Sequence, residues 1–227
     1  MKITYYGHAC FAVEVGGKTL LFDPFITPNP LAKEIDTAKI PADFILVSHG
    51  HNDHVADVVD IAHRTEATVI TSYEVGCWFE EKKGVKNVQA MNHGGVAKTD
   101  FGRVKLTAAI HSSSMPDGSY GGNPCGFVIE SKDGNFYYSG DTALTSDMKL
   151  IGETTRLNFA AFPIGDFFTM GIDDALRAAD MVGVTKILGL HYDTFPPIEI
   201  DHDAALKAAN AAGKNLFLPK IGEIIEL

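Results

Sequence analysis

The chain has 227 residues, enough to enclose a large hydrophobic core and consistent with one domain over residues 1–227. It carries 19 Lys and Arg against 29 Asp and Glu, a formal net charge of −10. An acidic surface disfavours nonspecific binding to nucleic acid or anionic membranes. We therefore expect a small-molecule substrate, no nucleic-acid partner and no membrane association.

Two further features bear on location. The sequence runs from Met1 directly into the strand-like Ile3–Tyr6 without a signal-peptide pattern, and no apolar stretch approaches the length of a membrane span. Cys10, Cys77 and Cys125 are odd in number and widely spaced, which is typical of reduced thiols. We expect a cytoplasmic protein, and a homo-oligomer remains open.

The first part of the chain predicts strands and then alternating strands and helices. Residues 2–6, 10–15 and 19–23 form a predicted meander with a hairpin turn at Gly16-Gly17. Residues 24–42 hold four of the ten prolines and predict a loop. Strand and helix patterns then alternate to about residue 90.

The second part repeats this order. Strands are expected near 103–110, 125–131 and 135–139, a helix over 172–182 that stops at Gly183, a last helix from Asp201 to Gly213, and closing strands at 216–218 and 224–225. Two mixed halves fit an α/β protein with two sheets covered by helices.

The most informative segment is His49-Gly50-His51-Asn52-Asp53-His54, which places four candidate metal ligands within six residues. It follows the continuous apolar run 44–47, which predicts a buried strand, and precedes a helical pattern. His49 and His51 can converge on one ion, while Asp53 and His54 lie beyond the turn and can reach a second. The alternative is a solvated polar loop, but the H-x-H-x-D-H pattern favours a metal site.

Three more candidate ligands lie downstream. His111, Asp141 and His191 each follow the C-terminal end of an apolar run, where open α/β sheets gather their functional groups. One such residue alone would more often be a hydrogen-bonded structural group. Three at equivalent positions, after the H-x-H-x-D-H turn, indicate metal ligation.

These residues occur in the same order along the chain as in the metallo-β-lactamase superfamily, which the chain resembles over essentially its whole length. It is most similar to stand-alone metal-dependent hydrolases related to L-ascorbate-6-phosphate lactonase, on three local motifs: Tyr6-Gly7-His8-Ala9, Phe22-Asp23-Pro24 and the segment 163–171. The resemblance implies a four-layer αββα sandwich.

The resemblance also implies a ligand set. One metal would be held by His49, His51 and His111, a second by Asp53, His54 and His191, with Asp141 bridging the two. Zinc is the first expectation for a nitrogen-rich site, and ligand type leaves manganese, iron and nickel open.

Such a site implies a metal-bridging hydroxide as the attacking group. Asp141 is expected to bridge the ions, and Asp53 either to accept the proton of the bridging water or to act as a plain ligand. His8 is either an active-site residue or structural. Asp23 either orients a ligand histidine or caps the turn before Pro24.

The segment Phe167-Phe168 and Tyr192 have two interpretations, as apolar walls of the pocket or as ordinary core and rim packing. Both residue types supply large apolar surfaces to cores and binding sites alike. The pattern does not decide between them.

The leading hypothesis is a dinuclear hydrolase that cleaves an ester, lactone, amide or phosphodiester in a small molecule. The resemblance to the lactonase group favours C–O or phosphate-ester cleavage and extends to phosphorylated metabolites as substrates. A nuclease is the second hypothesis, although no basic exosite or added domain is visible. A di-iron redox protein and a non-enzymatic metabolite sensor are the others. Because one fold hosts several chemistries, the resemblance does not choose the substrate.

Overall fold

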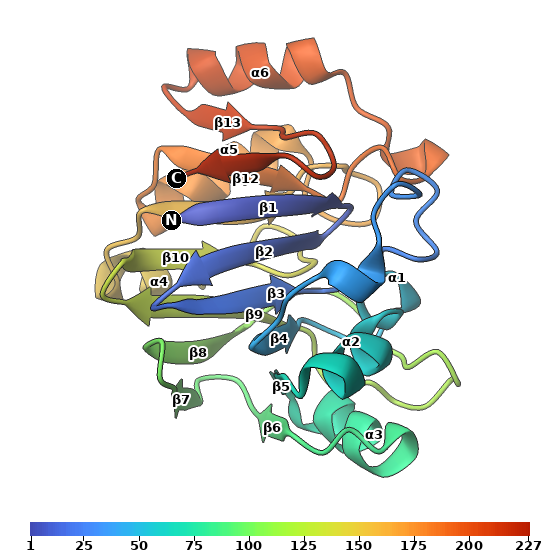
Figure 1. Cartoon of the computed structure of the whole chain (residues 1–227). Helices are drawn as coiled ribbons and strands as arrows, with labels where there is room; N and C mark the ends of the chain where they lie inside the picture. The colour runs from blue at the N-terminus through green and yellow to red at the C-terminus, as the bar shows by residue number, and fades with distance from the viewer.

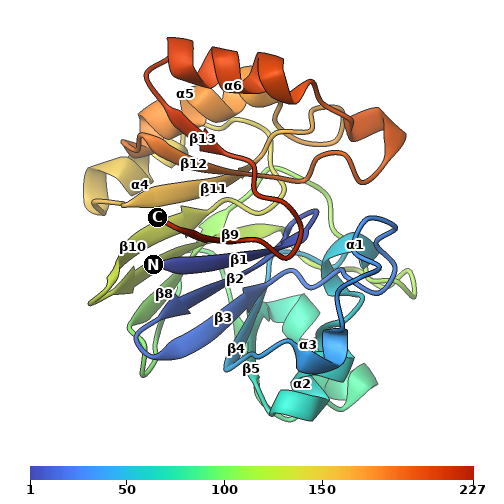
Figure 2. The same ribbon diagram turned by 45° about the horizontal axis from the view of Figure 1, so that its top comes forward.

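The computed structural model describes residues 1–227 and shows two seven-stranded sheets packed face to face, with helices outside both (Figures 1 and 2). The first sheet has the order β14 (Ile224–Glu226), β1 (Lys2–Gly7), β2 (Cys10–Val15), β3 (Lys18–Phe22), β4 (Phe44–Val47), β5 (Thr68–Ser72) and β6 (Val88–Met91). The second has the order β13 (Asn215–Phe217), β12 (Lys186–Leu190), β11 (Phe159–Pro163), β10 (Gly134–Tyr138), β9 (Cys125–Ser131), β8 (Arg103–Ala108) and β7 (Val96–Lys98).

The helices fall into two sets. The outer face of the first sheet packs against α2 (Val58–Thr65) and α3 (Tyr73–Lys83), after the short α1 (Asn52–Val55). The outer face of the second sheet packs against α4 (Met148–Thr154), α5 (Ile172–Val182) and α6 (His202–Ala211). Single 3₁₀ turns occur at Thr37–Lys39 and Pro196–Ile198. The arrangement is the four-layer αββα sandwich that the sequence predicts.

Each sheet begins antiparallel and continues parallel. Hairpins join β1, β2 and β3, and helical crossovers then place β4, β5 and β6 parallel to β3. The second sheet repeats the order, antiparallel from β7 to β10 and parallel from β10 to β13. The tight turn between β2 and β3 uses Gly16 and Gly17 at φ 62° and 79°, a conformation that glycine adopts without strain.

The space between the sheets is filled mainly by aromatic rings. Phe22 is fully buried there and stacks on Phe11 with ring centroids 4.5 Å apart. Its neighbour Leu21 points to the opposite face and packs with the helix-side cluster. This alternation along β3 is the two-residue period of a strand covered on both faces. Phe22 also contacts the rings of Phe136 and Tyr138 from the second sheet, so it ties the two sheets together.

The structure differs from the sequence expectations in three places. Strands β6 and β7 were not predicted, because they are short edge strands with mostly exposed side chains. The expected strand 103–110 ends at Ala108, since Ile110 N donates to Thr142 Oγ1 instead of the sheet. The last helix ends at Ala211 rather than at Gly213.

The carboxyl ends of the functional strands lie at one edge of the sandwich. In Figure 1 the arrowheads of β1 and β3 point to the side where α1 lies. Two backbone hydrogen bonds join the sheets at this edge, from His191 N to His8 O at 2.9 Å and from Cys125 N to Ser48 O at 2.9 Å. No helix is both long and apolar enough to cross a bilayer.

The central aromatic packing generates a stability prediction. Phe22→Ala should lower the free energy of unfolding by about 3–5 kcal/mol, because it leaves a cavity among rings from both sheets. Urea denaturation measures this loss. The matched control Leu150→Ala removes a side chain that is 60% exposed and should change the value by less than about 0.5 kcal/mol. Equal losses in the two variants would contradict this account of the core.

Candidate metal centre

The H-x-H-x-D-H segment forms the turn between β4 and α1. Strand β4 ends at Val47, and α1 begins at Asn52. His49 and His54 are completely buried, while Asp53 keeps 27% of its side chain exposed. The turn therefore places two imidazoles in the interior and one carboxylate at the surface of the site.

The seven sequence-predicted ligands meet at this edge, together with His8. Potential ligand atoms within 4.8 Å of one another form two main groups: His49, His51 and His111; and His8, Asp53, His54 and His191. Asp141 lies between them, with Oδ2 3.0 Å from His191 Nε2, 3.2 Å from His54 Nε2 and 3.7 Å from His111 Nε2. Asp23 forms a further group with His49 and His54. The first sheet and α1 supply one part of this set and the second sheet the other.

Three residues of the site have left-handed backbones directly after strands. His8 follows β1, Asp23 follows β3 and His191 follows β12, with φ of 55°, 39° and 55°. This region is sparsely populated by residues other than glycine, and such strain is concentrated at functional sites. Here it turns each side chain from the strand direction toward the cluster. Gly140, at φ 62°, does the same for Asp141, and a Cβ at Gly140 would collide with Cys125 O.

Asp23 is a buried hydrogen-bond acceptor at the centre of the site. Its Oδ1 accepts from Ser48 N at 2.7 Å. Its Oδ2 accepts from Ser48 Oγ at 2.5 Å, His54 Nδ1 at 2.8 Å and Tyr138 Oη at 2.6 Å. Because His54 donates through Nδ1, its Nε2 points into the cluster. Burial acts to lower the pKa of His54, but Asp141, Asp53 and Asp23 outweigh it and raise the pKa, so a metal would bind Nε2 in place of a proton. That Nε2 is buried without a hydrogen-bond partner, as expected for an atom that binds a metal.

Ser48 extends this control to His49. The Ser48 hydroxyl gives its proton to Asp23, so its oxygen accepts from His49 Nδ1 at 2.9 Å. The Nε2 lone pair of His49 then faces His51 Nδ1 at 3.0 Å. The buried carboxyl group of Asp23 thus orients one imidazole from each ligand group. It contacts His54 directly and His49 through the Ser48 hydroxyl.

His8 lies inside the cluster. Its Nδ1 is 3.0 Å from Thr194 Oγ1, whose hydroxyl donates to Tyr192 O, so His8 Nδ1 is the donor. His8 Nε2 therefore directs a lone pair toward Asp53 Oδ2 at 3.1 Å. Its ring is 4.0 Å from that of His191. Two hydrogen-bond acceptors this close together can hold one proton or one cation between them.

The electrostatics of the cluster fit a divalent cation. Burial lowers the pKa of His49, and burial together with His191 lowers that of His8 to about 4, so both imidazoles are neutral at pH 7. Burial acts to raise the pKa of Asp141, but His191 and His54 outweigh it and hold the pKa below its usual range. Neutral imidazole nitrogens with ionised carboxylates are the donor set of zinc and similar metals.

Sequence reasoning missed three polar residues of the site. Ser48 adjoins the histidine turn and could have been suspected. Tyr138 lies within an apolar strand pattern, and Thr194 lies in a loop with no motif, so neither carries a sequence signal. Both contact the site only through tertiary packing.

The cluster lies at the base of an open cleft of about 770 Å³. Its walls include Phe25, Phe168 and Phe195, whereas Tyr192 packs in the core on the outer side of the second sheet. Of the residues with two interpretations, Phe168 is therefore a pocket wall and Tyr192 a core residue. A concave site with apolar walls and a few convergent polar groups is typical of small-molecule binding.

Known proteins match both the sequence and the fold. Residues 2–191 match the family model of the beta-lactamase superfamily domain. A metal-dependent hydrolase of Flavobacterium johnsoniae is 54% identical over all of both chains, and one of Methylacidiphilum infernorum is 50% identical over 91% of each. The structure of a metallo hydrolase from the archaeon Ignicoccus hospitalis superposes with a TM-score of 0.87 at 33% identity, covering 99% of this chain and 97% of that one.

These matches cover the residues that form both sheets and the histidine-rich turn. The chain belongs to the metallo-β-lactamase superfamily, among its stand-alone metal-dependent hydrolases.

Proposed function

We propose that the protein binds two divalent cations, with zinc the first candidate, and hydrolyses an ester, lactone or phosphodiester bond in a small molecule. One observation carries the proposal: two histidine-rich groups meet around Asp141 at the base of a cleft. The first cation would be held by His49, His51 and His111, and the second by Asp53, His54 and His191. Asp141, whose Oδ2 is close to nitrogens of both groups, would be shared.

Bound divalent cations lower the pKa of a water molecule and polarise a substrate carbonyl or phosphoryl oxygen. The residues of the chain set the conditions for this chemistry. Asp141 is 3% exposed and is confined to the floor of the site. Because the floor of the cleft is buried, charge interactions there are stronger than in bulk water.

Asp53 is the best candidate for proton acceptor. It is the more exposed carboxylate of the pair and lines the cleft. Burial acts to raise its pKa, but His54 and His8 outweigh that effect and lower the pKa, so Asp53 is ionised at neutral pH. His8 Nε2 lies 3.1 Å from Asp53 Oδ2, so a proton taken up between these two acceptors would hold the carboxylate in its orientation. His8 is thus a positioning residue in this proposal.

The competing functions find less support. A nuclease needs cationic side chains along the nucleic-acid backbone, and no Lys or Arg lines the cleft. A di-iron redox protein would use the same ligands, so metal analysis with an optical iron spectrum separates it from a zinc hydrolase. A sensor would bind its ligand without turnover.

Metal content and hydrolysis test the proposal together. Purified protein should contain about two equivalents of divalent metal by mass spectrometry and cleave at least one class in a panel of esters, lactones and phosphodiesters. Asp141→Asn removes a charge that offsets both cations, so it should lower metal content and reduce kcat/KM by about 10³-fold or more. Equal rates for wild type and variant across the panel would refute the proposal.

The hydrogen bonds of Asp23 generate a separate prediction. Asp23→Asn should weaken metal affinity about 10–100-fold in competition with a chelator, because the amide cannot accept all the bonds that orient His54 and Ser48. Tyr138→Phe removes one of those bonds and should have a smaller effect, about fivefold.

Asp57→Asn is the matched control. Asp57 is also a buried carboxylate that accepts from backbone amides, Ile26 N at 2.6 Å and Thr27 N at 3.0 Å, but it contacts no candidate ligand. Its replacement should cost stability while metal affinity stays within about twofold of the wild-type value. If Asp57→Asn weakens metal binding as much as Asp23→Asn does, the specific role of Asp23 is excluded.

A further inference from the structure

We propose that the cleft selects substrates whose group next to the scissile bond is apolar and uncharged, an aryl or branched alkyl group, and that Phe168 and Phe195 recognise it. This inference rests on the proposed function and specifies the substrate class of the same site. The resemblance to the lactonase group pointed instead to a phosphorylated metabolite.

The walls of the cleft are aromatic and come from three separate loops. Phe25 follows β3, Phe168 lies between β11 and α5, and Phe195 precedes the last 3₁₀ turn. The rings of Phe25 and Phe195 are 6.3 Å apart, and each is 5.5 Å from the ring of His8. Apolar surface therefore begins directly beside the candidate ligands, and Pro28 and Pro197 extend it.

No residue that lines this cleft is Lys or Arg. Apart from the candidate ligands, its polar members are Asn52 and Ser112, and neither carries a charge. A phosphate or carboxylate held away from the metal ligands would lose its hydration without gaining a cationic partner, which is costly. Two divalent cations would carry four positive charges, of which Asp53 and Asp141 offset two, and the remaining charge acts at the reacting end rather than along the walls.

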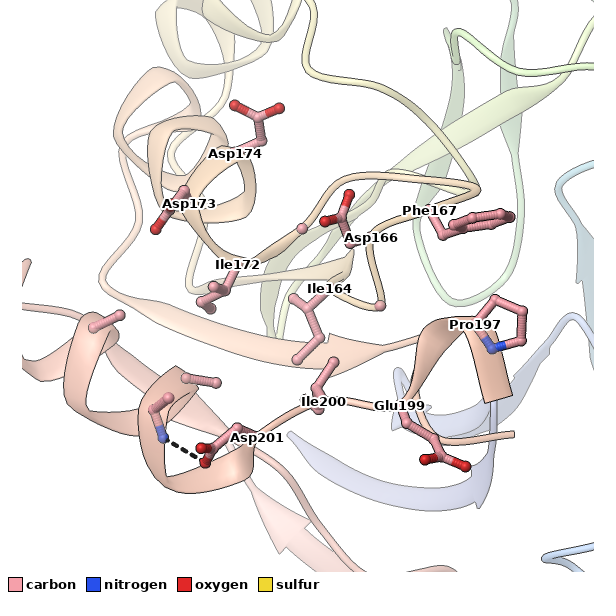
Figure 3. Close-up of a pocket in the computed structure, with 15 residues that line it drawn as sticks. Ile164, Asp166, Phe167, Ile172, Asp173, Asp174, Pro197, Glu199, Ile200 and Asp201 are labelled. Atoms are coloured by element: carbon pink, nitrogen blue, oxygen red, sulfur yellow. Dashed lines mark hydrogen bonds between the residues drawn. The ribbon is translucent and has the colours of Figure 1, made fainter. Parts of the chain in front are cut away.

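A neighbouring cavity reinforces this selection. It has about 850 Å³, shares Pro197 with the cleft and also lacks Lys and Arg among its lining residues. Five carboxylates surround its apolar floor (Figure 3): Asp166, Asp173, Asp174, Glu199 and Asp201. Asp174 pairs with Arg177 at 3.1 Å and Asp201 caps α6, but the lining still carries a net negative charge, which repels anions and lowers their local concentration.

The loop between β11 and α5 supplies a built-in comparison. Asp166 and Phe167 have φ of 58° and 52°, and Gly165 pairs with Gly171 to close the loop. This turn sends adjacent side chains to different places: Phe167 lines the carboxylate-rich cavity (Figure 3), and Phe168 lines the cleft. Their side chains are 72% and 50% exposed, so either can be replaced without disturbing the core.

The test compares two rigid esters with the same leaving group, 4-nitrophenyl 4-methylbenzoate and 4-nitrophenyl 4-carboxybenzoate. Their rates are normalised to hydrolysis by hydroxide alone. The metal-loaded enzyme should prefer the uncharged ester by about tenfold or more in kcat/KM. Phe195→Ala should raise KM for this ester by about tenfold and change kcat less, since it removes contact made equally before and during reaction.

Phe168→Lys should reverse the preference, because it places a cation in the cleft. The ratio of the two kcat/KM values should shift toward the carboxylate by about tenfold or more. Phe167→Lys adds the same charge one residue away, on a side chain whose ring lies 4.8 Å from that of Phe168 but outside the cleft lining, and should shift the ratio by about threefold or less. Similar shifts in both variants would overturn the role of Phe168.

A binding measurement separates this inference from the proposed function. Calorimetry with the protein freed of metal should show tighter binding of 4-methylacetophenone than of 4-acetylbenzoate. Preference for the anion in both assays overturns the inference while leaving hydrolysis intact. If no ester is cleaved but the ketone still binds more tightly, the hydrolase proposal fails and the apolar recognition stands.

Discussion

The carboxyl group of Asp23 is buried in the interior, where a polar group is costly unless hydrogen bonds compensate it. Four donors do so: Ser48 N, Ser48 Oγ, His54 Nδ1 and Tyr138 Oη. These donors come from the turn after β4, from α1 and from β10, so one side chain connects both sheets with the candidate metal ligands. Charge-assisted bonds of this kind are short and strong, and they set the direction of the imidazole lone pairs.

The edge at which the two sheets meet therefore holds the two halves of the chain together and also carries the candidate metal ligands. His49 and His54 come from the first half of the chain, while Asp141 and His191 come from the second. The halves are joined at this edge by the backbone bond from His191 to His8 and, deeper inside, by the rings around Phe22. Neither half alone contains both ligand groups. Packing between the sheets thus determines whether the donors converge.

The sequence predicted the parts of this arrangement that depend on local pattern. Strand periodicity and the H-x-H-x-D-H spacing are visible in a single chain, and strand ends indicated Asp141 and His191. Tyr138 could not be recognised, because a strand residue that donates to a buried carboxylate looks like any aromatic core residue. Phe167 lines one cavity and Phe168 the other, although their rings are in edge contact at 4.8 Å. This arrangement depends on left-handed backbone angles that the residue types do not indicate.

Selectivity and reactivity have one physical origin in this cleft. The floor of the cleft is buried, which lowers the local dielectric and strengthens the interaction of any cation with Asp141. The same low dielectric makes an unpaired anionic substituent costly to bring in. A cationic residue such as lysine on the wall would admit anions, but it would also draw in water and compete for the carboxylates. The absence of Lys and Arg from the lining is thus consistent with a site that gains reactivity by restricting its substrates to uncharged groups.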